Sequence, residues 1–213
     1  KCHCYKFLNQ INAIEKSGAD IIYSDWCIHE YDINEHIQVK KVIKKELHND
    51  YLFEILKDNW TCTNNYILKR SCGELIYNHN GWNPSTKVAQ DREYFVKAAI
   101  LGCKFAYTEG VYSVYNRRKR PSVSSMAFKK RTLNIQEMEY NFRVLIENSS
   151  SIHNKNRYIK VLNSRKIISC FYNNSIRFEN YITPFNIYWS IIHWKMIVFL
   201  PYILLKNNIK LKF

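Results

Sequence analysis

A carboxylate near the middle of the chain is the leading candidate for a chemically active group. Asp91 follows a polar loop, Gly81–Pro84, and lies within the run Val88–Glu93. This position predicts the first turn of a helix, where free backbone N–H groups and the helix dipole stabilise a negative charge. An ionised carboxylate can accept a proton, so Asp91 could act as a general base. Acids also occur in first turns as simple capping residues, and spacing alone leaves that alternative open.

The residues after Asp91 predict the helix that must position it. An apolar stripe at helical spacing is formed by Tyr94, Phe95, Ala98, Ala99 and Leu101. Gly102 follows the stripe, and glycine suits the left-handed conformation that often ends a helix.

Asp25 is a second carboxylate of interest. It ends the run from Ala19 to Asp25, whose short apolar stretch predicts a buried strand. In open α/β sheets such strand ends line the ligand site, so Asp25 could face a cleft. An acid in the turn after a strand is the alternative interpretation.

Other segments predict the framework around these acids. The first is a helix with Phe7, Leu8, Ile11 and Ile14 on its apolar side, closed by Gly18. Weak alternation over 36–42 predicts an edge hairpin. Asn49 or Asp50 could cap a short helix that contains Leu52, Phe53, Ile55 and Leu56.

Three polar residues, Thr63–Asn65, precede the apolar run 66–68. Beyond the Asp91 helix, 104–108 and 110–115 predict two strands that are joined by a turn at Glu109-Gly110.

Charge and cysteine content restrict the functions open to the chain. The net charge of +14 over 213 residues implies an anionic partner, such as nucleic acid, a nucleotide-linked donor or lipid headgroups. No nucleic-acid-binding motif is present, so nucleic acid is not an expected partner. Seven irregularly spaced cysteines favour a reducing compartment over a disulfide framework. No Cys/His pattern completes a four-ligand metal site, so no metal residues are predicted.

The second half of the chain predicts mainly helices. Composition shifts near Met126, and a helical stripe, with Ile135, Met138, Phe142 and Leu145, precedes a helix that begins near Tyr158 and runs through Tyr172. The segment 181–205 is aromatic and apolar, with Lys195 as its one formal charge. A one-sided polar stripe favours a helix lying in the membrane interface, although a core helix and a membrane span stay open.

Taken as an ordered set, these motifs resemble the GT-A glycosyltransferases of family 2. The similar stretches are Gly18–Trp26, Gly81–Asn83, Ala89–Asp91 and Gly102–Tyr107 leading to Tyr115. The resemblance covers about residues 6–125 and corresponds to the second half of the family's catalytic domain. It implies an α/β fold, a partial, Rossmann-like GT-A domain at 1–125 with a mixed sheet and flanking helices. The mainly helical extension would occupy 126–213.

The resemblance implies transfer of a sugar, with inversion, from a nucleotide-diphosphate sugar to an acceptor hydroxyl in cell-surface polysaccharide or glycolipid synthesis. Asp91 would be the general base. Acceptor binding would involve Trp82, Gln90 and Asn65, and the donor diphosphate would contact Arg117 or Arg118. Core packing for Trp82 and a solvated basic loop for the two arginines are the alternatives. The acceptor would be a glycan or lipid-linked, and the protein would be cytoplasmic, on the inner face of the membrane.

Two departures separate the chain from the family pattern. The family's D-x-D motif, which holds Mg²⁺ or Mn²⁺ and the donor diphosphate, would precede the first helix, and no such motif is present. The family's histidine after the last strand is also missing, because the chain reads Tyr115-Asn116-Arg117-Arg118. The chain is therefore expected to be a fragment that could be inactive alone. A non-catalytic basic module that binds membranes or nucleic acid is the alternative function.

Overall fold

The chain folds as a mixed α/β structure around a four-stranded sheet. The computed structural model describes residues 4–44, 46, 50–118 and 128–172. Strand β1 (Ile21–Tyr31) is central, and β4 (Phe105–Arg117) runs parallel to it along one edge. The opposite edge carries two antiparallel strands, β3 (Ile67–Leu68) beside the start of β1 and β2 (Ile37–Ile43) beside its end. The predicted α/β class with flanking helices and the edge hairpin are thus confirmed.

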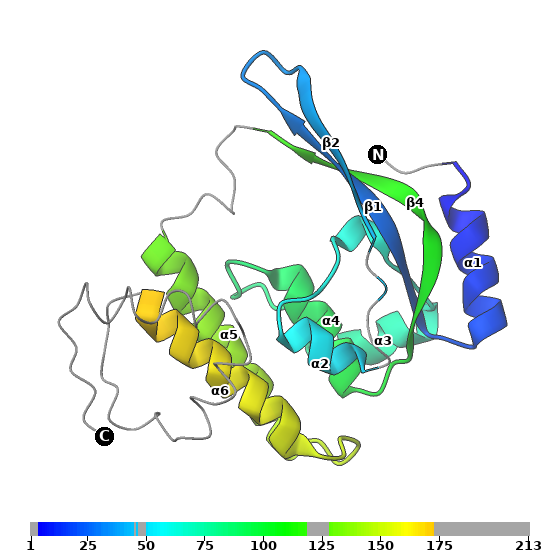
Figure 1. Ribbon diagram of the computed structural model, residues 1–213. Coiled ribbons are helices and arrows are strands. Elements are labelled where there is room, and N and C mark those ends of the chain that lie inside the picture. Colours follow the sequence, from blue (N-terminus) through cyan, green and yellow to red (C-terminus); the bar gives the residue numbers. More distant parts are fainter. Residues whose placement is uncertain (1–3, 45, 47–49, 119–127, 173–213) are drawn as a thin grey trace.

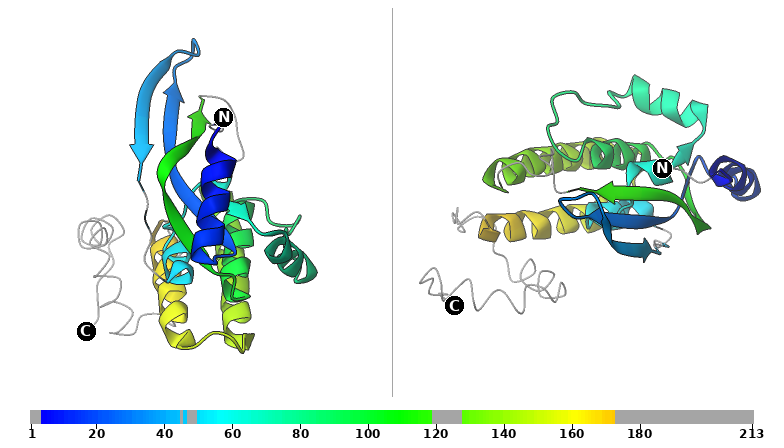
Figure 2. Two further views of the ribbon diagram at one scale, coloured as in Figure 1. Left: turned by 90° about the vertical axis from the view of Figure 1, so that its right-hand side faces the viewer. Right: turned by 90° about the horizontal axis from the view of Figure 1, so that it is seen from above.

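In the described ranges, six helices and one 3₁₀ turn surround this sheet. They are α1 (Lys6–Ser17), α2 (Tyr51–Leu56), the turn η1 (Thr63–Asn65), α3 (Arg70–Asn78), α4 (Gln90–Ile100), α5 (Phe128–Asn148) and α6 (Lys155–Tyr172). Figure 1 shows α1 beside β4 on one flank and the antiparallel pair α5 and α6 on the other, with α2 and α4 between them. The far parts of β1, β2 and β4 project beyond the helices as an arm, which the left view of Figure 2 also shows.

The core between the sheet and the helices is mainly aliphatic and includes several stacked aromatic rings. The rings of Tyr51 and Phe105 stack with centroids 3.7 Å apart, and Tyr66 stacks on Phe95 at the same separation. Helices α5 and α6 add buried residues to this cluster, namely Met138, Phe142, Ile146, Val161 and Leu162. One hydrophobic core therefore spans the composition change near residue 126.

Helix α1 forms where the sequence predicts it, but it turns a different face inward. Gly18 ends the helix with a left-handed φ of 66°, as predicted. The predicted apolar face is right for Ile14, which is buried, but wrong for Phe7 and Leu8, which are 61% and 58% exposed. Lys6 and Gln10 are buried in their place. The reason is hydrogen bonding, because Gln10 Nε2 donates to the carbonyl of Asn65 (2.7 Å) and Lys6 Nζ to that of Tyr66 (3.5 Å).

Strand β4 corrects a second prediction. The two expected strands at 104–108 and 110–115 are one continuous strand, and Glu109-Gly110 is not a turn that ends it. The register with β1 shifts between Ser24, which pairs with Thr108, and Asp25, which pairs with Val111. This shift identifies a bulge in β4 at Glu109-Gly110. Gly110 adopts a φ of 127° in this bulge, a backbone conformation that residues other than glycine rarely adopt.

The remaining local predictions are confirmed. Asp50 caps α2, because its Oδ1 accepts from the N–H of Phe53 at 2.9 Å. Asp91 lies in the first turn of α4, and Gly102 after that helix has a positive φ. The predicted interfacial segment 181–205 lies outside the described residues. No helix in the described part of the chain is long and apolar enough to cross a bilayer.

Candidate active site

A pocket of about 290 Å³ opens beside Asp91, where β1 and β4 leave the core. The first turn of α4 and the segment before β3 form its walls, and the two parallel strands form its floor. Its lining residues are Trp26, Ile28, Trp60, Thr61, Cys62, Thr63, Asn64, Asp91, Tyr115 and Arg117.

Asp91 is partly exposed and oriented by two hydrogen bonds. Its Oδ2 accepts from the hydroxyl of Thr63 at 2.8 Å, and its Oδ1 accepts from the backbone N–H of Arg92 at 3.0 Å. Both contacts fix the orientation of the side chain. Each oxygen keeps further lone pairs, so the side chain can still accept a proton from a bound hydroxyl group.

The floor of the pocket follows from strand alternation. Trp26 and Ile28 are two residues apart on β1, as are Tyr115 and Arg117 on β4, so each pair shares a face. The parallel register places Ile28 opposite Tyr115. Sequence reasoning did not select Trp26, Trp60, Thr63 or Tyr115 as site residues. The two-residue spacing along each strand could have indicated which side chains share a face. It could not indicate that the two faces meet, because that depends on the pairing register of β1 with β4.

Asn65 supports the pocket wall instead of facing a ligand, which corrects its predicted acceptor-binding role. The residue is fully buried. Its Nδ2 donates to Thr61 Oγ1 at 2.6 Å, and its Oδ1 accepts from the hydroxyl of Ser113. Since both ends of the amide bind protein groups, Asn65 fixes the segment that carries Thr63.

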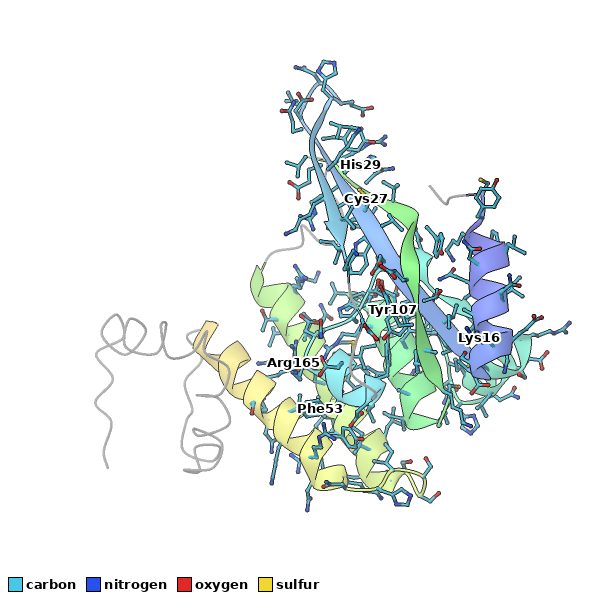
Figure 3. The ribbon with its side chains drawn as sticks, turned by 45° about the vertical axis from the view of Figure 1, so that its right-hand side comes forward. Lys16, Cys27, His29, Phe53, Tyr107 and Arg165 are labelled. Atoms are coloured by element: carbon cyan, nitrogen blue, oxygen red, sulfur yellow. The ribbon has the colours of Figure 1, made fainter. Side chains whose placement is uncertain are left out.

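Asp25 does not face the pocket, so the predicted cleft position is wrong. Its side chain is 1% exposed. The carboxylate accepts from the Tyr107 hydroxyl at 2.8 Å and from the Gly110 N–H at 3.3 Å. Tyr107 lies within the body of the sheet, below the projecting arm that carries Cys27 and His29 (Figure 3). Asp25 therefore stabilises the β4 bulge.

Two other predicted acceptor-binding residues do not line the pocket. Trp82 is 53% exposed, and its ring lies 6.0 Å from that of Tyr94, one helical turn beyond Asp91. Gln90 Nε2 donates to the carbonyl of Thr86 at 2.6 Å, which ties α4 to the preceding loop. In this structure neither side chain joins Asp91 in forming the pocket.

The two predicted diphosphate-binding arginines lie in different surroundings. Arg117 lines the pocket and forms an exposed ion pair with Glu30, with Nη1 2.7 Å from Oε1. Arg118 lies over the ring of Tyr31, 5.2 Å from its centroid. Only Arg117 therefore places a positive charge beside the Asp91 pocket.

The described residues do not form a metal site at this pocket. Asp91 is the one carboxylate among the lining residues, and the others supply hydroxyl, thiol, amide, guanidinium, aliphatic and aromatic groups. Across the described ranges, no three His, Cys, Asp or Glu side chains gather closely enough to hold an ion. A divalent cation, which prefers several oxygen ligands, does not fit these residues.

Arg92, the residue after Asp91, anchors the same helical turn in the core. It is 1% exposed, and burial lowers the pKa of its guanidinium group. Its Nη1 donates to Glu139 of α5 at 3.0 Å, and its Nη2 donates to the carbonyl of Leu56 at 3.0 Å. Arg165 of α6 bonds the same Glu139 oxygen, Oε1, at 2.5 Å. Figure 3 shows Arg165 on α6. Sequence reasoning missed this buried network, which holds the start of α4 against α5 and α6.

The reactivity of the Cys62 thiol tests how strongly the pocket lining is shielded from water. Burial raises the pKa of its thiol from 9.0 to about 11. At pH 8 this lowers its thiolate fraction roughly a hundredfold, and the thiolate is the reactive form. We expect maleimide to label Cys62 far more slowly than the exposed Cys4, as followed by peptide mass spectrometry. Equal labelling rates would contradict the raised pKa of the half-buried Cys62 thiol.

Comparisons of the chain with protein-family models, with curated proteins and with solved structures give no match.

Proposed function

We propose that this chain is the acceptor-side part of an inverting GT-A glycosyltransferase of family 2. The observation that carries the proposal is Asp91, a partly exposed carboxylate that Thr63 orients inside a pocket lined in part by aromatic side chains. The order of motifs along residues 6–125, which resembles that family, supports the same assignment. The finer GT-A description of the α/β fold belongs to this proposal.

The chemistry follows from the position of the carboxylate. An acceptor hydroxyl in the pocket donates its proton to Asp91 while its oxygen attacks the anomeric carbon of the donor sugar. A new bond forms between the acceptor oxygen and the anomeric carbon, on the face opposite the diphosphate. The bond from that carbon to the diphosphate breaks, and the diphosphate leaves with the electron pair. Arg117, at the pocket, can contact the negative leaving group. Family members use a divalent metal at this step, but the described residues do not fit one, so no step is assigned to it.

The residues that line the pocket support a sugar as the acceptor. Trp26, Trp60 and Tyr115 offer flat apolar surfaces, which suit the faces of sugar rings, and Thr63 and Asn64 offer hydrogen-bonding groups. We therefore propose a glycan or a lipid-linked sugar as the acceptor, and a nucleotide sugar as the donor. The basic charge and the segment 181–205 support work at the inner membrane surface.

Release of nucleoside diphosphate is the direct test of this proposal. The protein is expressed from its complete reading frame and incubated with a panel of nucleotide-diphosphate sugars and with glycan or glycolipid acceptors. We expect acceptor-dependent release of the nucleoside diphosphate and a glycosylated product whose anomeric configuration is inverted in its NMR spectrum. A retained configuration, or no transfer with any donor, would overturn the proposal.

Thr63→Val should weaken this reaction without stopping it. Valine keeps the shape of threonine but cannot donate a hydrogen bond to Asp91, so the carboxylate loses one orienting contact. We expect kcat to fall roughly tenfold, as for the loss of one hydrogen bond to a charged group. Thr108→Val, on β4 outside the lining residues, is the matched control and should leave kcat unchanged. Equal rates for the two variants would show that the Thr63 contact is not used.

A further inference from the structure

Two buried thiols lie side by side at the other end of the domain. Cys72 belongs to α3, and Cys103 lies between α4 and β4. Their Sγ atoms are 2.8 Å apart, and their exposed fractions are 3% and 9%. The two residues are 31 positions apart in the sequence, so the packing of α3 against the end of α4 brings them together.

The contact makes the two sulfur atoms chemically different. The Cys72 thiol donates its hydrogen to Cys103 Sγ. This bond lowers the pKa of Cys103 and raises that of Cys72, because it stabilises the thiolate of the acceptor. Thiolates are the nucleophilic form of cysteine, so Cys103 is the better nucleophile of the pair.

Cys103 is also the sulfur that a small molecule can approach. It lines a second pocket of about 600 Å³, which also includes Lys104, Phe105 and His153. Phe105 begins β4 whereas the Asp91 pocket meets the end of that strand, so the two pockets are separate. Cys72 is not among the residues that line this second pocket.

We propose that Cys72 and Cys103 form a redox-active dithiol that hydrogen peroxide or a small organic peroxide oxidises to a disulfide. The Cys103 thiolate attacks a peroxide oxygen, the O–O bond breaks, and Cys103 becomes a sulfenic acid as water or an alcohol leaves. Cys72 then attacks the sulfenic sulfur, the S–O bond breaks, and water leaves. Each sulfur gives up one electron overall, two thiol hydrogens end in the released molecules, and the peroxide is reduced.

The disulfide would close a loop that contains the Gly81–Pro84 segment and the whole of α4. Cross-linking reduces the freedom of the unfolded chain, so oxidation should stabilise the fold. We expect the melting temperature of the full chain to rise by roughly 5–10 °C on oxidation and to return to its original value with dithiothreitol.

The experiment is to expose the folded chain to hydrogen peroxide, block free thiols under denaturing conditions and map the peptides by mass spectrometry. We expect a Cys72–Cys103 cross-linked peptide that has lost two hydrogen atoms and that reduction releases. Cross-linking should precede oxidation of the half-buried Cys27 and Cys62. If Cys103 instead pairs with another cysteine, or if both thiols stay reduced while Cys62 is oxidised, the proposal is wrong.

Variants separate the two roles. Cys72→Ala should leave Cys103 trapped as a sulfenic acid, which dimedone labels, whereas Cys103→Ala should leave Cys72 unlabelled. Cys27→Ala, which removes a half-buried thiol on β1, is the matched control and should retain the cross-link. Dimedone labelling of Cys72 rather than Cys103 would reverse the assigned order, and absence of the cross-link in the control would overturn the pairing. Because neither readout uses sugar transfer, these outcomes are independent of the proposed function.

Discussion

Asp91→Asn is expected to lower kcat for sugar transfer by roughly 10²- to 10⁴-fold, the range for loss of a general base. Asparagine has nearly the shape of aspartate, and its amide oxygen can still accept from the Thr63 hydroxyl. It cannot take a proton from an acceptor hydroxyl at neutral pH. Since binding contacts are largely kept, KM for both substrates should change little, which places the loss in the chemical step.

The measurement is nucleoside diphosphate release by the protein expressed from its complete reading frame. Glu109→Gln is a matched control, because Glu109 is an exposed carboxylate on β4, outside the pocket, whose side chain forms an ion pair with Lys44 at 3.5 Å. We expect the control to retain full activity. Undiminished turnover in Asp91→Asn, with unchanged circular dichroism, would exclude Asp91 as the base.

Glu139→Ala is expected to lower the free energy of unfolding by about 3–5 kcal/mol, as when one partner of a buried ion pair is removed. Glu139 is 6% exposed and accepts from both Arg92 and Arg165. Without it, Arg92 stays buried with its charge and faces a second guanidinium group. The nearest remaining carboxylate, Asp58, lies 3.6 Å from Arg92 Nε but has a half-exposed side chain, which weakens its compensation.

Glu147→Ala on the same helix is the matched control for this stability measurement. Glu147 pairs with Arg143 at 2.8 Å, but both side chains are 43% exposed. An exposed pair of this kind contributes about 0–1 kcal/mol. Urea unfolding followed by circular dichroism should therefore separate the two variants clearly. Similar losses in both would show that the buried network is not the connection between α4 and α5.

The sequence predicts those elements whose signals are local. Gly18 and Gly102 end helices because glycine adopts a positive φ readily, and Asp50 caps α2 because its side chain reaches the N–H three residues on. The position of Asp91 in the first turn of α4 follows from the same kind of reasoning. Such signals involve residues within one helical turn, so they need no knowledge of distant partners.

Predictions that depend on distant partners were wrong or missing. Gln10 and Asn65 are polar residues that the structure buries, since each finds its hydrogen-bonding partners on another segment. Asp25 faces inward for the same reason, because Tyr107 and the β4 bulge lie 82 or more residues away. Patterns of polarity along the chain cannot reveal such pairings, so they assign these residues to the surface or to a ligand.

The pocket floor and the core share the same two strands. The first residues of β1, Ile21 and Ile22, are fully buried, whereas Ile28 and Tyr115 lie farther along and are partly exposed. The buried start of the sheet and the pocket floor are thus different parts of the same strands. Substitutions at Ile28 and Tyr115 could therefore change the selectivity of the pocket for its ligand, by evolution or by engineering. The buried core at Ile21 and Ile22 would remain intact.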